Sequence, residues 1–580
     1  MCGISGIIGT FSPDKLQKML QIISYRGPDE TTVFSDNLCS IGLNRLKIKG
    51  NTTNKIQFNI FGRKVVVALN GEIYNYQSLR DHYSKNANYC FETDLELELL
   101  ALMYVVDGEL FINKVDGMFS IAIYDSRKLI LYRDRVGIKP FYYTVNNRGM
   151  IFSSEIKAIV IVDENFHDIN MSTLMEQLLL SFGISENETI LKDIHQLSPG
   201  SYLKFENDSY FVKKYYNFTP IEVSADIEEN IAITENLLDQ AAIKCFKHDN
   251  LSKGLFLSGG IDSALLALKA HQLSFPFSAY TLSPDNNDDF EDALHAKELS
   301  KKLNINHHVM HVNKELAINS LIKFTYFYEN IDFAGIFSPY GGLAFYLISK
   351  EISTFHRVAI SGDGADELFA GYQSLHSNSQ NVFNDIYNRA NKIADRSGYK
   401  EHILNTLRRR FFSTDSPLVL YDLLLDSGLN NYHLPCLDKC TSCFSMELRP
   451  IYLDINLYEH ARNIGLSQNM HDGMNKYILQ KLSKKSLGQV GINMVSKRKK
   501  LAMPSALDGV IGHINQKLKD IYGISNQPRN KFSDLFLTIE QRIMFDLFYY
   551  IFVYKKCNIN VDEVTLSEII RSKEFSKMYN

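Results

Sequence analysis

The sequence lacks several features that mark specialised classes of protein. It has no tryptophan, only 8 cysteines in 580 residues, and a formal net charge of −4. So few cysteines exclude the disulfide framework of a small secreted protein. The near-neutral charge excludes a global basic field, so we expect no nucleic-acid partner.

Long hydrophobic runs are also missing. A membrane-spanning helix needs about 20 apolar residues, whereas the most apolar window, Phe545 to Tyr554, is about half as long and contains Asp546. The N-terminus has neither the basic segment nor the cleavage site of a signal peptide. We therefore expect a soluble, cytoplasmic protein with no membrane partner, and a buried helix at this window.

One cysteine cluster requires a decision between two interpretations. Cys436, Cys440 and Cys443 form a C-x3-C-x2-C pattern, and His433 lies close to it in the sequence. No fourth ligand follows at a spacing typical of zinc sites. We favour reduced cysteines that pack in the core over a metal site.

One stretch joins a strand, a glycine turn and the start of a helix. The apolar run Gly254 to Leu257 predicts a buried strand, and Ala264 to Lys269 predicts a helix. Two adjacent glycines between them let the backbone approach an anion, and the amides of the helix start point at negative charge. Asp262 would repel a phosphate unless a divalent cation lay between them, which predicts Mg²⁺.

This stretch has no lysine, so it is not a G-x-x-x-x-G-K-S/T loop. It resembles the S-G-G-x-D-S loop of the ATP pyrophosphatases, although an ordinary glycine-rich turn is the alternative. The resemblance implies that ATP and its leaving pyrophosphate contact Leu257, Ser258, Gly259, Gly260, Asp262 and Ser263.

The N-terminus offers a nucleophile. Removal of the initiator Met1 would make Cys2 the first residue, so that its thiol and its own α-amine share one residue. An α-amine has a pKa of about 8 and can act as the base for the thiol, directly or through a water molecule. A coincidental cysteine after Met1 is the alternative.

Further motifs accompany Cys2 along the first domain. They are Tyr25-Arg26-Gly27-Pro28-Asp29, Asn44-Arg45-Leu46, Asn70-Gly71-Glu72-Ile73-Tyr74-Asn75, Thr93-Asp94, the segment from Asp116 to Asp125, the segment from Arg133 to Tyr143, and Ser153 to Ala158. Together they resemble the class II glutamine amidotransferases. The resemblance implies a four-layer α-β-β-α sandwich of the N-terminal nucleophile (Ntn) hydrolase fold.

The chemistry of glutamine hydrolysis suits these residues. The side-chain amide of Asn70 and the backbone N–H of Gly71 are suited to stabilise the tetrahedral oxyanion. The resemblance implies that Arg45 binds the α-carboxylate of glutamine in a bidentate manner. It also implies that the carboxylate of Asp94 binds the α-ammonium of glutamine, with Glu72 nearby. Two residues depart from the common pattern of the family, because Tyr25 and Asn44 stand where histidine or a basic residue is frequent.

A second acid-rich glycine turn occurs in the second half of the chain. The segment from Val358 to Tyr372 resembles the S-G-E/D-G-x-D-E-x-F-x-G-Y motif of asparagine synthetases. The resemblance places Ser361 and Gly362, together with Tyr280, at the nucleotide. It places Asp366 on Mg²⁺ with Asp262. It also makes Asp363 important for acyl-adenylate formation and Lys476 the cation that neutralises phosphate charge.

Other segments match the family less closely. Lys439 stands where arginine is usual, and Pro450-Ile451-Tyr452 replaces x-Pro-Phe. The basic run Lys497 to Lys500 falls near a family motif in an ambiguous register. His307-His308 we interpret as structural, because the family commonly has this pair there.

The motifs predict two domains and one combined activity. We place a class II glutamine amidotransferase domain at residues 1–218, and a doubly wound parallel-sheet ATP-pyrophosphatase domain with extra helices at residues 228–580. The expected reaction is glutamine hydrolysis to ammonia, followed by ATP- and Mg²⁺-dependent conversion of a carboxylate, by default aspartate, to an amide. The alternatives are the same chemistry on another carboxylate, in secondary metabolism or surface polysaccharide synthesis, and a non-catalytic glutamine-sensing scaffold. The oligomeric state stays open, with a homodimer as the candidate.

Overall fold

The computed structural model covers the whole chain and supports a description of most of it. The described residues are 1–49, 53–126, 128–163, 165, 168–285, 290–332, 341–372, 375, 379–397, 401, 405, 417–471, 473–491, 507, 510–522 and 532–578. Within these residues, no helix combines the length and the apolar character needed to cross a membrane. The basic run Lys497 to Lys500 lies outside the described residues.

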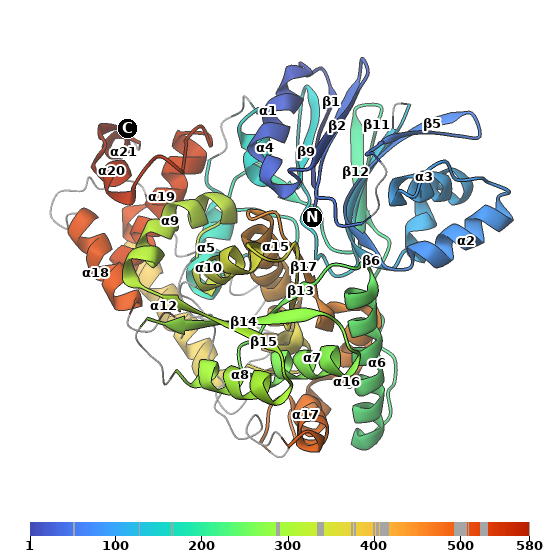
Figure 1. Cartoon of the computed structure of the whole chain (residues 1–580). Coiled ribbons are helices and arrows are strands. Elements are labelled where there is room, and N and C mark those ends of the chain that lie inside the picture. The colour runs from blue at the N-terminus through green and yellow to red at the C-terminus, as the bar shows by residue number, and fades with distance from the viewer. Residues whose placement is uncertain are drawn as a thin grey trace.

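The first domain is built on two antiparallel sheets that face each other (Figure 1). One sheet has the order β10-β8-β9-β1-β3-β2, and the other has the order β12-β11-β7-β6-β5-β4. Their strands are β1 (Gly3–Gly9), β2 (Glu30–Ser35), β3 (Cys39–Arg45), β4 (Gln57–Ile60), β5 (Arg63–Ile73), β6 (Gly117–Asp125), β7 (Lys128–Arg133), β8 (Tyr142–Asn146), β9 (Gly149–Ser153), β10 (His195–Gln196), β11 (Ser201–Glu206) and β12 (Ser209–Lys214).

Helices cover the outer faces of these sheets, as Figure 1 shows. Helices α1 and α4 lie on the first sheet, and α2 and α3 lie on the second. Their bounds, with that of α5, are α1 (Asp14–Ile22), α2 (Tyr76–Asn86), α3 (Glu96–Asp107), α4 (Ile156–Val160) and α5 (Met171–Leu180). Gly42 permits the close approach of α1, because a Cβ there would lie 2.4 Å from a methyl group of Leu20. The predicted α-β-β-α sandwich is confirmed.

The second domain contains a parallel sheet with the order β15-β14-β13-β16-β17. The strands are β13 (Lys253–Phe256), β14 (Phe277–Pro284), β15 (Asn306–Val312), β16 (Val358–Ser361) and β17 (Glu447–Pro450). The chain builds outward from β13 in one direction and then continues from β16 in the other. The crevice beyond the carboxyl ends of β13 and β16 is therefore the topological switch point, where open α/β sheets bind ligands.

Helices lie on both faces of this sheet, with α7 and α8 on one face and α10 and α15 on the other (Figure 1). The predicted doubly wound domain is thus confirmed. Its helices are α6 (Ile227–Lys247), α7 (Ile261–Gln272), α8 (Glu291–Lys302), α9 (Lys314–Tyr328), α10 (Gly341–Ser353), α11 (Ala365–Leu368), α12 (Ser379–Ser397), α14 (Pro417–Leu423), α15 (Leu434–Ser442), α16 (Ile455–Asn469), α17 (Tyr477–Gln489), α18 (Ile511–Tyr522), α19 (Ile539–Phe548), α20 (Leu566–Arg571) and α21 (Lys573–Lys577).

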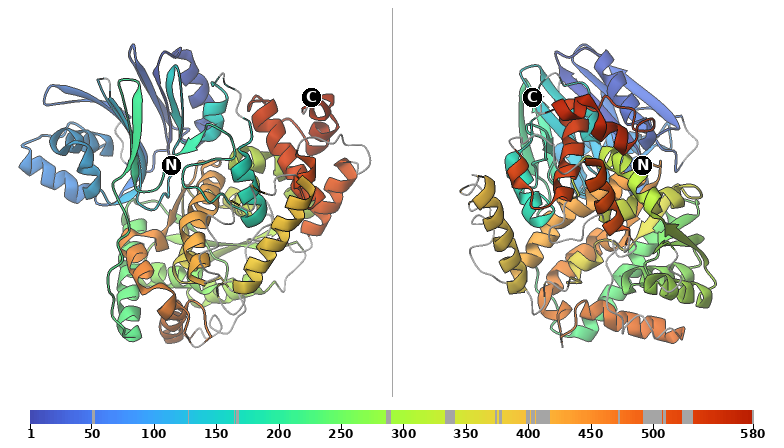
Figure 2. Two further views of the ribbon diagram at one scale, coloured as in Figure 1. Left: turned by 180° about the vertical axis from the view of Figure 1, so that it is seen from behind. Right: turned by 90° about the vertical axis from the view of Figure 1, so that its left-hand side faces the viewer.

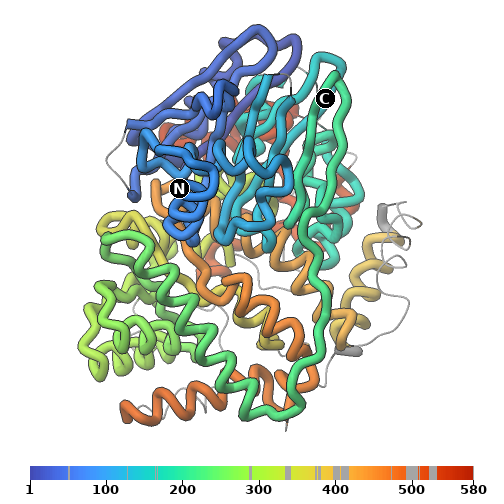
Figure 3. The backbone as a smooth tube through the Cα atoms, turned by 90° about the vertical axis from the view of Figure 1, so that its right-hand side faces the viewer, coloured from blue at the N-terminus to red at the C-terminus, as the bar shows by residue number. Residues whose placement is uncertain are grey.

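Two segments outside these layers complete the chain. Residues 215–226 run along the second domain before α6 turns back towards the first (Figure 3). At the other end, α18, α19 and α20 pack against α9 and form a separate helical group with α21 (Figure 2). The predicted buried helix at Phe545 to Tyr554 lies in this group, where it spans the end of α19 and a following π-helical turn, Tyr549–Tyr554.

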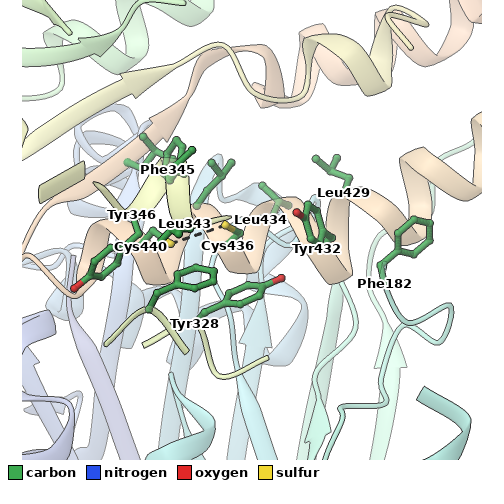
Figure 4. Close-up of a cluster of buried hydrophobic side chains, with 14 of the residues drawn as sticks. Phe182, Tyr328, Leu343, Phe345, Tyr346, Leu429, Tyr432, Leu434, Cys436 and Cys440 are labelled. Atoms are coloured by element: carbon green, nitrogen blue, oxygen red, sulfur yellow. Dashed lines mark hydrogen bonds between the residues drawn. The ribbon is translucent and has the colours of Figure 1, made fainter. Parts of the chain in front are cut away.

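The cysteine cluster lies in the hydrophobic core of the second domain. Cys436, Cys440 and Cys443 are buried, and their surroundings are mainly apolar and aromatic side chains (Figure 4). The sulfur atoms of Cys436 and Cys440 are 3.9 Å apart. Burial raises the pKa of Cys440, which disfavours the thiolate that a metal would need. These contacts support the interpretation as packing cysteines.

Candidate active sites

A cavity in the first domain brings together most of the residues predicted to bind glutamine. It has a volume of about 310 Å³, and its wall includes Cys2, Arg45, Gly71, Glu72 and Asp94. Cys2 directly precedes β1, Arg45 ends β3, Gly71 and Glu72 lie in β5, and Asp94 lies just before α3. The cavity also contacts apolar side chains, including Leu43, Leu69 and Leu97.

Asn70 lies directly beside Cys2, the predicted nucleophile. Its Oδ1 accepts a hydrogen bond of 3.0 Å from the backbone nitrogen of Cys2. Its Nδ2 is buried and has no hydrogen-bond partner within the described structure. A buried amide donor normally has a partner. This donor is therefore suited to hydrogen-bond the oxyanion that would form on a carbonyl attacked by the Cys2 thiol.

Met1 lies directly before Cys2 in the chain and influences the pKa of the Cys2 thiol. It is 1% exposed, and its α-amine lies 3.6 Å from the Glu447 carboxylate of the second domain. Burial raises the pKa of the Cys2 thiol, and the nearby α-ammonium of Met1 opposes this shift. Removal of Met1 would turn the Cys2 nitrogen, already held by Asn70, into the proposed base.

Two other predicted residues have defined local constraints. Gly71 has φ +131°, and a Cβ there would lie 1.9 Å from the carbonyl oxygen of Met118, so the position requires glycine. Arg45 is anchored by Glu30, at 3.1 Å, and by the carbonyl oxygen of Lys49, at 3.2 Å. These contacts hold the Arg45 guanidinium in place at the wall of the cavity.

The second site lies at the switch point of the parallel sheet. After β13, the Ser263 hydroxyl accepts a 3.1 Å hydrogen bond from the Ser258 nitrogen and lies 3.3 Å from the Ser258 hydroxyl. Gly259 has φ +67°, a conformation that favours glycine. Helix α7 begins at Ile261 with no side-chain cap, which leaves its first amides available to an anion.

Lys476 joins the two acid-rich turns. Its Nζ lies 2.6 Å from Asp262 Oδ2 and 2.8 Å from Asp366 Oδ1. Burial opposes the charge of this lysine, but Asp262 and Asp366 raise its pKa above the usual value. Lys476 has φ +49°, an uncommon conformation for a residue other than glycine. The structure thus brings three predicted residues together.

Gly371 makes this contact possible. A Cβ at Gly371 would lie 1.9 Å from Asp366 Oδ1 and 2.2 Å from Lys476 Cε. Gly362 has a similar but looser role, because a Cβ there would lie 3.3 Å from the Cβ of Asp262. The sequence motif contains Gly371, yet motif reasoning gave it no function.

The residues fit the predicted divalent cation. Asp262 Oδ1 is buried and has no hydrogen-bond partner within the described structure. Asp262 and Asp366 are on the two turns that would enclose a nucleotide, and carboxylate oxygens are the ligands that Mg²⁺ prefers. These two residues would therefore hold the ion.

Asp363 lies in the turn between β16 and α11. Burial raises its pKa to about 6. Nearby, His433 Nε2 is 3.2 Å from Glu367 and 3.1 Å from the hydroxyl of Tyr372. Motif reasoning assigned no role to these three neighbours. Tyr452, one of the departures from the family pattern, donates a hydrogen bond of 3.1 Å to the carbonyl oxygen of Asp262.

Two family models match the chain, one in each domain. The model described as "Glutamine amidotransferase domain" matches residues 1–216, and the model described as "Asparagine synthase" matches residues 234–521. The chain belongs to the glutamine-hydrolysing asparagine synthetase family. The predicted family is therefore confirmed, as is the expectation of an enzyme of the glutamine-dependent ligase class.

Curated members of the family are distant relatives of this chain. Asparagine synthetase [glutamine-hydrolyzing] 2 of Bacillus subtilis is 29% identical over 522 residues, which cover 83% of this chain and 68% of the relative. Asparagine synthetase [glutamine-hydrolyzing] 1 of B. subtilis is 28% identical, over 64% of this chain and 59% of the relative. Putative asparagine synthetase [glutamine-hydrolyzing] 2 of Methanocaldococcus jannaschii is 28% identical, over 64% of this chain and 76% of the relative.

The departures of this family member from the common pattern have structural explanations. Asn44 is buried, donates to the carbonyl oxygen of Leu20 at 2.8 Å and accepts from Thr31 at 2.9 Å, so it has a structural role in β3. Tyr25 donates a hydrogen bond to Glu155, and Lys439 forms an ion pair of 2.9 Å with Glu329.

Tyr25 and Lys439 belong to one buried network between the two domains of this synthetase. Lys157 pairs with both Glu155, the partner of Tyr25, and Glu329, the partner of Lys439. It therefore connects Tyr25 with Lys439. Burial opposes ionisation of Glu155, but Lys157 and Arg26 lower its pKa to about 2.

Arg26 extends the network across the domain boundary. It pairs with Glu155 at 2.7 Å and with Asp438 of α15 at 2.8 Å. Its Nε donates to the carbonyl oxygen of Cys2 at 3.0 Å. Cys2 of the first domain is therefore connected to the second domain through the buried Arg26.

Tyr280 is the predicted nucleotide residue that stands apart from the others. Its ring stacks on His308, with centroids 4.8 Å apart, and its hydroxyl is 3.0 Å from His356. Its carbonyl oxygen accepts a hydrogen bond of 2.8 Å from the Leu257 nitrogen. His307 contacts the Thr281 hydroxyl at 2.8 Å, which supports its structural interpretation.

Proposed function

We propose that this protein is a glutamine-dependent amidotransferase that converts a carboxylate into an amide at the expense of Mg-ATP. The proposal depends above all on one observation. A cavity lined by Cys2 and a cluster of Asp262, Asp366 and Lys476 at the switch point of the parallel sheet occur in the same chain. The first arrangement suits amide hydrolysis, and the second suits adenylate formation with release of pyrophosphate.

In the glutaminase half, the Cys2 thiolate attacks the side-chain carbonyl of glutamine. Asn70 and the N–H of Gly71 donate to the oxyanion. Arg45 binds the α-carboxylate, and Asp94 with Glu72 binds the α-ammonium. Ammonia leaves, a γ-glutamyl thioester forms on Cys2, and water hydrolyses it to glutamate.

In the synthetase half, an oxygen of the acceptor carboxylate attacks the α-phosphorus of ATP and expels pyrophosphate. Ser258 to Ser263 and the start of α7 bind the pyrophosphate, and Lys476 neutralises its charge. Ser361 and Gly362 contact the adenosine, for which Tyr280 is the remaining candidate contact. Asp262 and Asp366 would hold Mg²⁺, which would supply neutralisation of phosphate charge. Asp363 assists adenylate formation, and ammonia then displaces AMP.

Aspartate is the default acceptor in this proposal. The identity of the acceptor can be tested by carboxylate-dependent exchange of labelled pyrophosphate into ATP, because exchange requires a reversible acyl-adenylate. We expect exchange with aspartate and asparagine formation when glutamine is added. Exchange with another acid and none with aspartate would replace the default acceptor. No exchange with any acid, together with no glutamate formation, would favour the non-catalytic scaffold.

The domain limits 1–218 and 228–580, the cytoplasmic location and the homodimer also remain proposals. Size-exclusion chromatography with light scattering would measure the oligomeric state. A monomer at working concentration would contradict the homodimer.

A further inference from the structure

A histidine from the second domain forms part of the wall behind the glutamine cavity. His248 follows the last residue of α6, and its side chain is 5% exposed. Its Nε2 lies 2.5 Å from Glu72 Oε2 and 3.9 Å from Glu96 Oε1. Its ring also packs edge-on against Tyr74, with centroids 5.4 Å apart. The histidine thus contacts the Glu72–Tyr74 segment of the first domain.

The other oxygen of Glu72 faces a second cation from the same domain. Arg449 NH2 lies 3.7 Å from Glu72 Oε1. This arginine is itself fixed by Asp249, at 2.7 Å, and by Glu447, at 2.9 Å. One carboxylate of the first domain is therefore held on both sides by side chains of the second.

Glu72 is also part of the cavity that contains Cys2. Glu96 is a neighbouring part of the wall, and its carboxylate accepts a hydrogen bond of 3.2 Å from the Ile73 nitrogen. This bond fixes the backbone next to Glu72. The direction in which the Glu72 carboxylate points then depends on its side-chain partners, His248 and Arg449.

A metal ion is the competing interpretation of this cluster. The ligand atoms of Glu72, Glu96 and His248 all lie within 4.8 Å of one another. However, Arg449 places a positive charge 3.7 Å from one of these carboxylates. Burial, followed by the charge of Glu72, raises the pKa of Glu96 well above its usual value, which disfavours a second carboxylate ligand. A direct hydrogen bond between imidazole and carboxylate explains the contact without an ion.

We propose that His248 is a positioning residue that orients Glu72 towards the α-ammonium of glutamine. This rests on the proposed function, in which Glu72 helps to bind that group. The imidazole N–H donates to one oxygen of Glu72 and balances the pull of Arg449 on the other. Without it, the carboxylate turns towards Arg449 and away from the cavity. The affinity of the first domain for glutamine thus depends on its contact with the second.

Kinetics of glutamate formation test this proposal in the full-length protein. His248→Ala should raise the KM for glutamine about tenfold, since hydrogen bonds to charged groups are among the stronger ones. We expect kcat to change less than about twofold, because Cys2 and Asn70 are untouched. His248→Gln retains an N–H donor and should recover most of the lost affinity. The matched control is Lys247→Ala, at an exposed neighbouring position, with an unchanged KM.

Two kinetic outcomes would overturn the proposal. One is a KM for glutamine in His248→Ala within about twofold of the wild-type value. The other is an equal fall of kcat in His248→Ala and His248→Gln with no change in KM, which would indicate a purely structural role. Thermal unfolding of each variant checks that the domains stay folded.

A binding measurement separates failure of this inference from failure of the proposed function. Calorimetry should show that glutamine binds to the Cys2→Ala variant. In the double variant that carries both Cys2→Ala and His248→Ala, the affinity for glutamine should be about tenfold lower. Binding that is insensitive to His248→Ala would overturn the inference alone. No binding of glutamine to Cys2→Ala would contradict the proposed glutamine site itself.

Discussion

Substitution of Gly371 by alanine should damage the synthetase site selectively. The added Cβ would lie 1.9 Å from Asp366 Oδ1 and 2.2 Å from Lys476 Cε, well inside van der Waals contact. One of these groups must therefore move by more than about 1 Å, and a misplacement of that size can cost about 100-fold in rate. Overpacking adds a loss of stability of about 1–3 kcal/mol.

The assay is ammonia-dependent release of pyrophosphate, with glutamate formation from glutamine measured in parallel. We expect the first rate to fall about 100-fold and the second to stay near wild type, because the cavity at Cys2 belongs to the other domain. Gly488→Ala is a matched control in α17, the helix that follows Lys476, since nothing lies within 4 Å of the added Cβ. Pyrophosphate release by Gly371→Ala within about threefold of wild type would refute the assigned role of the Asp366–Lys476 contact.

Three further predictions follow from the buried polar groups. Asn70→Asp keeps the acceptor for the Cys2 nitrogen but loses the buried donor, so glutaminase kcat should fall about 100- to 1,000-fold; a fall below tenfold would exclude Asn70 from the oxyanion hole. Burial raises the pKa of Asp332 to about 7, so its stabilising contribution is full at low pH and is lost as pH rises through 7. The stability of Asp332→Asn relative to wild type should therefore improve between pH 4 and pH 8, by up to about 4 kcal/mol in denaturant unfolding, and a pH-independent difference would contradict this pKa. Arg26→Met leaves Glu155 and Asp438 without a shared cation, so the free energy of unfolding should fall by about 3–5 kcal/mol; a loss below about 1 kcal/mol would show that the network has little energetic weight.

The sequence was most informative where chemistry depends on a short local pattern. The strand–glycine–helix pattern around Ser258 to Ser263 predicted a strand and the start of a helix, and the resemblance of the second acid-rich turn to the asparagine synthetase motif placed Asp366 with Asp262. Both expectations agree with the structure, because a βα turn is determined by residues close together in the chain. The residues predicted to form the glutamine site, Cys2, Arg45 and Asp94, likewise share one cavity.

Contacts between distant residues that no family motif covers were beyond sequence reasoning. His248 and Glu72, for example, are separated by 176 positions. No local periodicity encodes such pairs, because they arise from the way in which the two domains and the sheet pack. The same limit applied to Tyr25 and Lys439, whose departures from the family pattern became interpretable only through Lys157. The roles of the individual site residues remain predictions until variants are measured.

Separation of the two half-reactions tests the central claim most directly. The measurement is pyrophosphate release by Cys2→Ala, with either glutamine or ammonium as the nitrogen source and with the acceptor identified by exchange. The two-site account predicts no glutamine-dependent release and an ammonia-dependent rate close to wild type, whereas Asp262→Ala should lose both. Loss of the ammonia-dependent reaction in folded Cys2→Ala would contradict the account.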